Sequence, residues 1–537
     1  MKSFDKINLL AILIICLIGC DSYTQQQQHI PWPSLADSPW PNNRGDAQAT
    51  GRSKYVGPRT PNVIWRKDMP LGILHGPVIG YNNDLFVGTR AFRGFTGDTT
   101  NFFYSLDKNG ENIWTFITST PQANIAGPTI TNNGIIYFAS TEPGGLYAPN
   151  PNGTLKWINE KFVAIYLTRY IPLAKNNNLY ITWFDTLFVL QPENGNIIDT
   201  IHSFLGYNIA DDIVFSTGGD TIFYFSGRIQ TEDPKALNAM TIQGEHLWAV
   251  EFHWNTHNRG TPVVNNENRI YIFAEETPAN KFLYCINPDG TINWQYPLDI
   301  NENYEDYSSP TIDRNGNIIF PSSKFVGPDA DSGYVTSLDY YGNLNWKTSL
   351  GHYWNDGAFI NSGLVSDAEG KIYCGSSYGT NTNFWCLDSD GEILWKLDLE
   401  GYEYDTSPAI NSEGTIYIGT HLGSIFQNHI RNLIAVRDTV TSVENNAQVI
   451  LKYKLEQNYP NPFNSLTHIK YTISQSGIVS LKVFDMLRNE IKTLVNRYQN
   501  LGEYDVLFES NDLSSGIYFY TLNSGNFTAT KKLILLK

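Results

Sequence analysis

Residues 386–395 read CLDSDGEILW, and this decamer decides how the chain folds. Asp388 and Asp390 flank a serine and Gly391 follows, which is how a calcium-binding loop begins. The same letters also suit a tight polar turn that leads into a strand ending at Trp395. The other copies of the decamer in the chain decide between these two interpretations.

The decamer recurs, and in each copy a glycine precedes a tryptophan by four residues. The copies are SLDKNGENIW (105–114), APNPNGTLKW (148–157), TIQGEHLW (241–248), CINPDGTINW (285–294) and SLDYYGNLNW (337–346), with a degenerate copy, LQPENGNIID (190–199), in which Asp199 replaces the tryptophan. Proline and tyrosine stand where a calcium site needs oxygen ligands. The constant features therefore predict a polar turn whose glycine takes a positive φ.

A second element alternates with the first and consists of a short apolar strand, an Asn/Gly turn and another strand, which is the pattern of a hairpin. Its clear copies are residues 76–89, 127–140, 171–183, 261–274, 309–322 and 407–420, and weaker copies are residues 209–225 and 361–376. Each repeat thus predicts four strands, A to D. Four-stranded repeats of this length are typical of β-propeller blades.

The repeat count predicts how the ring closes. There are eight A–B elements, but the last one has no D strand after it, whereas NVIWRKD (62–68) is an isolated D-like strand upstream. An open ring would leave two unpaired strand edges, so we expect residues 62–68 to complete the eighth blade. The predicted fold is all-β: an eight-bladed β-propeller over residues 35–436, closed by an N-terminal strand.

The repeated LDxxGxxxW pattern and the stretch WPNNRGDAQATGRSKYVGP (40–58) resemble PQQ-like propeller repeat proteins. This resemblance is specific for fold and weak for function. It implies that a tryptophan docks between neighbouring blades at each of seven positions: Trp65, Trp114, Trp157, Trp248, Trp294, Trp346 and Trp395.

The N-terminus predicts export. Lys2 and Lys6 precede an apolar run that is too short to span a bilayer, so residues 1–19 read as a signal peptide. The run ends in LIGC (17–20), which resembles the bacterial lipoprotein box and implies lipidation of Cys20; a plain signal peptide cut elsewhere is the alternative. Residues 20–34 then suggest a flexible tether.

The C-terminal sequence differs from the repeats. Residues 437–455 are polar and predict a linker, and residues 456–537 alternate in short strands that predict a small Ig-like β-sandwich. LEQNYPNPFN (455–464), SSGIYFYTL (514–522) and KKLILLK (531–537) resemble the type A C-terminal sorting domain of the type IX secretion system. That resemblance implies passage across the outer membrane and a place on the cell surface or in the medium. An Ig-like domain without a sorting role is the alternative.

Composition and motifs narrow the chemistry. The chain of 537 residues has a net charge of −16 and no basic stripe, which argues against a nucleic-acid partner. It has no adjacent cysteine pair, no CxxCH, no GxSxG and no HExxH, and no calcium-ligand set aligns to any blade. We therefore expect no catalytic residues, no metal site, and neither PQQ nor calcium. Cys285 and Cys386 read as core thiols, and pairing of Cys374 with Cys386 stays open.

Loop lengths predict the working face. The A–B and C–D turns are short, whereas the B–C and D–A connections are long and irregular, and binding residues concentrate on loops of this kind. We expect a protein or glycan ligand on the B–C/D–A face, with packing of the same aromatic rings between blades as the alternative. The candidate residues are His253, Trp254, His257, Arg259, Tyr304, Tyr307, His352, Tyr353, Trp354, Asp356, Tyr402 and Tyr404.

The sequence thus favours a non-catalytic surface or secreted binding protein. Its expected partners are the type IX machinery through residues 456–537, an unidentified protein or glycan, and the membrane only through a lipid at Cys20. Two other functions stay open: a quinoprotein-like oxidoreductase, and an envelope assembly scaffold resembling the propeller lipoprotein of the outer-membrane barrel assembly machine.

Overall fold

The regular structure of the described chain is entirely β, in antiparallel sheets, as the sequence predicts. The computed structural model describes residues 26–73, 75–90, 101–118, 127–141, 144–162, 171–203, 207–227, 235–252, 261–277, 280–299, 302–304, 309–324, 332–352, 360, 363–375, 382–401, 407–420, 432–438, 453–474, 477–499, 502–510, 513–525 and 527–537.

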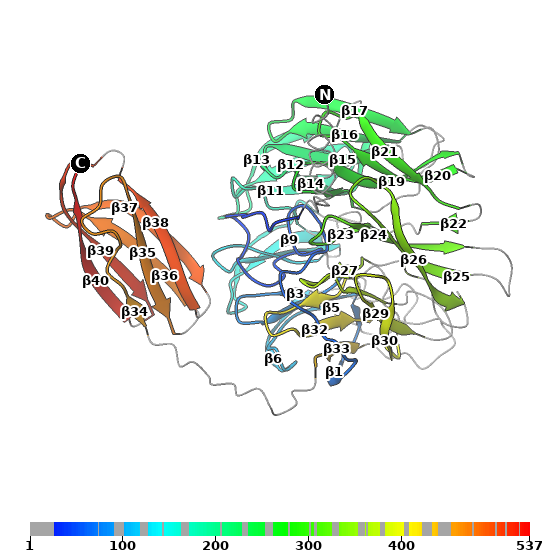
Figure 1. Ribbon diagram of the computed structural model, residues 1–537, viewed down its shortest axis with the longest axis horizontal. Coiled ribbons are helices and arrows are strands. Elements are labelled where there is room, and N and C mark those ends of the chain that lie inside the picture. Colours follow the sequence, from blue (N-terminus) through cyan, green and yellow to red (C-terminus); the bar gives the residue numbers. More distant parts are fainter. Residues whose placement is uncertain are drawn as a thin grey trace, which may run out of the picture.

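Eight sheets lie between residues 63 and 436, and they follow one another in chain order (Figure 1). The first joins β1 (Val63–Asp68) to β33 (Asn432–Val436), β32 (Ile416–Gly419) and β31 (Ala409–Ile410). The second contains β2 (Gly72–Ile73), β3 (Val78–Ile79), β4 (Leu85–Arg90), β5 (Asn101–Leu106) and β6 (Asn112–Thr118). The third contains β7 (Thr129–Ile130), β8 (Ile136–Thr141), β9 (Gly144–Pro149) and β10 (Leu155–Asn159), and the fourth contains β11 (Leu179–Trp183), β12 (Thr186–Leu190) and β13 (Ile197–His202).

The remaining four sheets repeat this order. The fifth contains β14 (Asn208–Phe215), β15 (Thr221–Gly227), β16 (Lys235–Thr241) and β17 (His246–Phe252). The sixth contains β18 (Val263–Val264), β19 (Ile270–Thr277), β20 (Asn280–Ile286) and β21 (Ile292–Pro297). The seventh contains β22 (Glu302–Asn303), β23 (Thr311–Ile312), β24 (Ile318–Lys324), β25 (Ser332–Leu338) and β26 (Leu344–His352). The eighth contains β27 (Val365–Ser366), β28 (Ile372–Gly375), β29 (Asn383–Leu387) and β30 (Ile393–Asp398).

The decamer and its copies form the turn that leads into the last strand of seven of the eight sheets; the first sheet ends in β1 and has no such turn. One carboxylate oxygen of Asp388 accepts the backbone N–H groups of Asp390 at 3.0 Å and Glu392 at 2.9 Å. Gly391 has a φ of 86°, which a residue with a side chain rarely adopts. The aspartate is thus a turn-forming residue that bonds the backbone ahead of it.

A small side chain faces each repeat tryptophan across the sheet. Cys386 in β29 is the register partner of Trp395 in β30, and Cys285 in β20 is the partner of Trp294 in β21. Directly opposed residues point to the same face of a sheet, so a bulky residue there would compete with the indole for space. The equivalent positions are Ser105, Ala148, Ala239 and Ser337.

The repeat tryptophans also join six of the eight sheets to the next one. An indole N–H donates to a turn carbonyl of the following sheet at 2.8–3.2 Å in six pairs: Trp65 to Lys108, Trp114 to Pro151, Trp157 to Pro192, Trp248 to Pro288, Trp294 to Tyr340, and Trp346 to Ser389. The indole of Trp395 donates to Pro58 at 3.4 Å. In the degenerate fourth sheet, Ile201 instead packs against the turn glycine Gly244.

The first and last strands of the repeat region pair with each other. β1 runs antiparallel to β33, with Trp65 opposite Ala435 and Asp68 opposite Asn432. The pairing expected for residues 62–68 is therefore present, and the blue β1 lies beside the yellow β33 in Figure 1. This pairing covers the strand edge that β33 would otherwise expose.

The lead-in segment, residues 26–58, is packed against the sheets. Gln27 is only 3% exposed, and its N–H donates to the carbonyl of Arg314 at 2.8 Å. Trp40 is fully buried. The described end of the predicted tether is thus part of the folded structure, because its backbone is hydrogen-bonded and its apolar side chains are covered.

In seven successive sheets the lead-in segment bonds to strand A, here called the inner strand, or to a residue beside it. The pairs are Trp40 with Ile79, Leu35 with Thr131, Trp32 with Leu173, Gln48 with Phe215 and Val264, Thr50 with Ile312, and Gly51 with Ser366. Five of these strands, β3, β7, β18, β23 and β27, are only two residues long. The lead-in segment therefore satisfies backbone groups that these short strands leave without a partner in their own sheet.

The C-terminal residues form two sheets with their own core. One contains β34 (Lys454–Leu455), β35 (Leu466–Ile473) and β38 (Gly502–Glu509), and the other contains β36 (Gly477–Phe484), β37 (Glu490–Gln499), β39 (Gly516–Ser524) and β40 (Phe527–Leu535). The short strands predicted in this region are present as six strands of eight to ten residues, with the two-residue β34 in addition. The core consists only of side chains from this region, among them Phe463, Tyr471 and Tyr520.

Candidate functional site

Most of the loop-face candidates lie outside the described residues. These are His253, Trp254, His257, Arg259, Tyr307, Tyr353, Trp354, Asp356, Tyr402 and Tyr404, and the predicted lipidation residue Cys20 also lies outside. The structure describes Tyr304 and His352. The proposed loop face therefore stays a prediction for ten of its twelve residues.

Tyr304 is a packing residue. Its ring is buried and stacks on Phe273, with centroids 4.8 Å apart and planes 14° from parallel. Its hydroxyl donates to Glu275 at 3.4 Å. His352 is half-buried at the end of β26, opposite Ser332. Of these two candidates, Tyr304 thus contributes to the core rather than to an open surface.

An ionic cluster fixes the connection that leaves β21. Lys347 Nζ lies 2.8 Å from Glu302 and 3.0 Å from Asp299, and the Glu302 side chain is almost fully buried. Burial by itself would lower the pKa of Lys347, but the two carboxylates outweigh it and the pKa is raised. The cluster keeps Lys347 charged and holds Glu302 and Asn303 as the extra strand β22.

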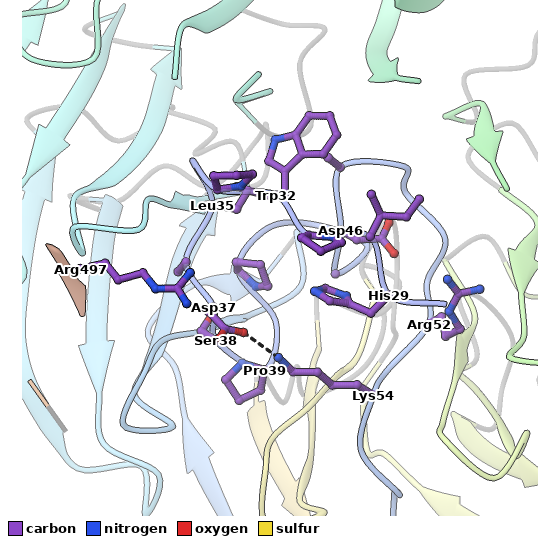
Figure 2. A pocket seen from close by; sticks show the side chains of 17 residues that line it. His29, Trp32, Leu35, Asp37, Ser38, Pro39, Asp46, Arg52, Lys54 and Arg497 are labelled. Carbon is purple, nitrogen blue, oxygen red and sulfur yellow. Dashed lines mark hydrogen bonds and ion pairs between the residues drawn. The ribbon is translucent and has the colours of Figure 1, made fainter. Parts of the chain in front are cut away.

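A cavity of about 270 Å³ is lined by the lead-in segment and by Arg497 of β37 (Figure 2). Its apolar wall contains Trp32, Leu35 and four prolines, and its polar side includes an ion pair between Lys54 and Asp37 at 3.0 Å. The remaining charged or polar lining residues are His29, Ser38, Asp46, Arg52 and Arg497. The lead-in segment contacts the short A–B turns, so this cavity lies on the opposite side of the sheets from the long connections.

The charges of this cavity are nearly balanced. Burial and the cation of Lys54 lower the pKa of His29, so its imidazole is neutral at physiological pH. Burial raises the pKa of Asp37, but Lys54 outweighs that effect and the net shift is downward. Sequence reasoning missed this cavity because the lead-in segment lies outside the repeats. Its one signal was the density of Arg, Asp and Lys residues in residues 40–58.

The NYPNPFN motif (458–464) organises the C-terminal sheets. The Asn458 side chain is buried and donates to Thr467 Oγ1 at 3.0 Å and to the Pro460 carbonyl at 3.1 Å. Its backbone N–H donates to the Tyr520 hydroxyl at 2.8 Å, and that hydroxyl donates to the Glu456 carbonyl at 2.6 Å. Asn458 therefore ties the start of the domain to β35 and β39.

The same motif clamps the last strand. Asn461 accepts the N–H of Ile534 at 2.9 Å through its side-chain oxygen. The N–H of Phe463 donates to the carbonyl of Ile534 at 2.9 Å, and the carbonyl of Phe463 accepts the N–H of Leu536 at 2.8 Å. The Phe463 ring is buried in the domain core. The two stretches that resemble sorting-domain motifs, at 455–464 and 531–537, thus form one structural unit.

The described thiols lie in the cores of the sheets. Cys374 is opposite Trp385 and Cys386 is opposite Tyr373, so the two cysteine side chains point to opposite faces and form no disulfide. Burial raises the pKa of the Cys285 and Cys386 thiols to about 12. Among the residues that the structure describes, no three His, Cys, Asp or Glu side chains group as a metal site. Within those same ranges, no helix is long and apolar enough to cross a membrane.

Comparison with solved structures finds weak similarities. The chain resembles Raptor of Chaetomium thermophilum with a TM-score of 0.41 and 8% identity, over 71% of this chain and 29% of the Raptor chain. It resembles a eukaryotic initiation factor with a TM-score of 0.35 and 8% identity, over 82% of this chain and 91% of that one. It resembles a Bacteroides caccae protein of unknown function with a TM-score of 0.29 and 13% identity, over 46% of this chain and 90% of that one. These values assign no function.

Sequence comparison identifies one part of the chain. No curated protein matches it significantly. The C-terminal region does match a family model, and the matched segment begins one residue before Asn458 and includes all of β40. The family supports export through type IX secretion and an interaction with that machinery. Residues 457–536 match the family described as the secretion system C-terminal sorting domain.

Proposed function

We propose that this chain is cargo of the type IX secretion system: an eight-bladed β-propeller that is delivered to the cell surface or the medium and binds a protein or glycan there without catalysing a reaction. The observation that carries the export half is the sorting-domain match over residues 457–536. The binding half rests on the arrangement of the eight sheets and their long connections.

The propeller interpretation is supported by sheet order and closure. Eight antiparallel sheets follow in sequence, six of them joined to the next by a tryptophan N–H on a turn carbonyl. The pairing of β1 with β33 brings the two ends of the repeat region into one sheet. A ring is the arrangement that explains both features, because it leaves neither end with an open edge.

The binding interpretation is supported by the unequal faces. The short turns bond to the lead-in segment on one side, and the long connections leave the other ends of the same strands. Connections of this length on a rigid scaffold are where binding residues gather. The aromatic residues of these connections, Trp254 and Trp354 among them, offer flat apolar faces to a sugar ring or a protein anchor.

Export is tested by removing the sorting domain. In a bacterium with a type IX system, the full chain should be cleaved by protease added to intact cells or be recovered from the medium. A chain that ends before Glu456 should accumulate in the periplasm. Export of the truncated chain at the level of the full chain would contradict the proposal. A Cys20→Ala chain separates the roles of the two signals: if Cys20 carries a lipid, the exported protein shifts from the membrane fraction to the medium.

Binding is tested on a glycan array and by capture of envelope proteins with the full chain. A specific ligand should lose its affinity for a Trp254→Ala/Trp354→Ala chain, and unchanged affinity would place the site elsewhere. A dye-reduction assay with PQQ, calcium and an alcohol or aldose tests the oxidoreductase alternative. Dye reduction that depends on both additions would overturn the non-catalytic proposal.

A further inference from the structure

Tyr459 differs from its neighbours in the NYPNPFN motif. Asn458, Asn461 and Phe463 all bond or pack inside the domain, whereas the Tyr459 side chain is 80% exposed. Its backbone is fixed, because Tyr459 and His468 exchange two N–H···O bonds of 3.0 Å. The motif thus fixes the backbone of an aromatic residue whose ring lies in solvent, where the ring contributes little to domain stability.

The ring lies in a row of side chains across one sheet face. Tyr459 is the register partner of His468 in β35, and His468 is the partner of Leu507 in β38. Directly opposed residues share a face, so these three side chains stand side by side. Leu466, two residues before His468, is on the same face. Leu466 and Leu507 are about half exposed, at 45% and 48%.

Charged groups border this row. His468 Nδ1 lies 2.9 Å from a carboxylate oxygen of Asp505, and Lys470 Nζ lies 3.7 Å from the other oxygen. Glu456, Gln457 and Tyr459 complete a groove of about 430 Å³ with these residues. Exposed aromatic and apolar side chains beside polar and charged groups are the usual composition of a protein–protein contact surface. We name it the Tyr459 patch: Tyr459, Leu466, His468, Lys470, Asp505 and Leu507.

We propose that the Tyr459 patch is the surface through which the sorting domain docks on a protein component of the type IX export machinery. This rests on the proposed export function. The partner's matching surface would present an apolar pocket for the phenol ring and the two leucines, with polar groups facing Lys470 and Asp505. Buried aromatic anchors carry much of the affinity in such contacts, so the loss of the ring should affect export more than it affects the fold.

The test measures export of full-length variants in a type IX-competent bacterium. We expect Tyr459→Ala/Leu507→Ala to lower the amount at the surface and in the medium by about tenfold, the effect of about 1.4 kcal/mol of lost docking energy, with the chain retained in the periplasm. Leu487→Ala is the matched control, because Leu487 is 82% exposed at the β36–β37 turn, outside the patch. It should be exported like the unmodified chain.

The retained chain must be folded for this result to count. Its C-terminal domain should resist protease as well as the unmodified domain does; if it does not, Leu466→Lys provides a second variant that keeps Tyr459 and reverses the apolar character of the patch. Normal export of a folded patch variant would overturn the proposal, as would an equal defect in Leu487→Ala. Normal export of the chain lacking residues 456–537 would instead contradict the proposed export function itself.

Discussion

At the scale of single residues, the turn glycine of the decamer has two separable roles. Gly391 has a positive φ, and a Cβ built on it would lie 2.5 Å from the Trp346 ring. Gly370 has nearly the same φ, 85°, but its nearest neighbour would be an ordinary 3.5 Å away. Substitution of Gly370 therefore measures the cost of backbone strain alone, and substitution of Gly391 measures the same strain plus the loss of the contact with Trp346.

We expect Gly370→Ala to lower the free energy of unfolding by about 1–2 kcal/mol, which is the cost of a side chain at left-handed φ. Gly391→Ala should cost about 1–3 kcal/mol more, because the methyl group displaces the indole. Urea titration of both variants measures the difference. Equal losses would show that the contact between Trp346 and the turn contributes nothing to stability.

The thiols give a second prediction at this scale. Cys285, Cys374 and Cys386 are buried, and burial raises the pKa of Cys285 and Cys386 to about 12. The thiolate is the reactive form, so at pH 8 both groups stay protonated. A chain lacking residues 1–20 should react with a thiol reagent at three positions after unfolding and at a far slower rate when folded. Rapid native labelling, or a disulfide mass, would contradict the observed register.

At the scale of elements, the lead-in segment depends on Arg44. Its guanidinium is buried and donates to the carbonyls of Ala49, Pro310 and Leu364, and so connects the lead-in segment to the seventh and eighth sheets. Arg44→Met should lower the free energy of unfolding by more than about 3 kcal/mol, because buried carbonyls lose charged donors. Arg59→Met, at an exposed ion pair with Glu369, should change it by less than about 1 kcal/mol. Thermal unfolding of the two variants measures the difference. Equal losses of stability would contradict the prediction and would mean that the lead-in segment is only loosely attached.

The NYPNPFN element gives an equivalent pair of variants. Asn458→Ala removes three side-chain hydrogen bonds, two that Asn458 donates and one that it accepts from Gln457, and leaves Thr467 with one donor fewer. We expect a loss of about 1–3 kcal/mol in the C-terminal domain, whereas Asn464→Ala at an exposed position should have little effect. The rate at which protease cleaves this domain within the full chain is the measurement, and equal rates for the two variants would argue against the clamp.

At the scale of the whole molecule, closure depends on segments far apart in the sequence. A chain lacking residues 26–68 would lose β1 and the lead-in segment, which would expose the edge of β33 and the short inner strands. Exposed edges pair with other chains, so this variant should associate or aggregate. A chain that ends before residue 453 should stay monomeric, because the C-terminal core is separate. Light scattering after gel filtration distinguishes the two shortened chains. If the chain lacking residues 26–68 were monomeric and unfolded cooperatively, the pairing of β1 with β33 would not be needed for folding.

The sequence by itself determined the strands, the turns and the sorting domain. Strand period, turn glycines and the GxxxW spacing are local features, and local sterics and hydrogen bonds fix them without reference to distant residues. The repeat count also predicted that residues 62–68 pair with the last strands, because a missing strand and a surplus strand can be counted along the chain.

Only the tertiary structure decided where the lead-in segment lies, which rings pack and which are displayed, and which face each thiol occupies. The lead-in segment carries no repeat, and its bonds to seven successive sheets can form only where those sheets lie side by side. Tyr304 and Tyr459 are both strand-flanking tyrosines, yet one is buried against Phe273 and the other stands in solvent. The decamer CLDSDGEILW thus forms a turn that its own residues determine. Its contact with Trp346 of the seventh sheet depends on the tertiary structure.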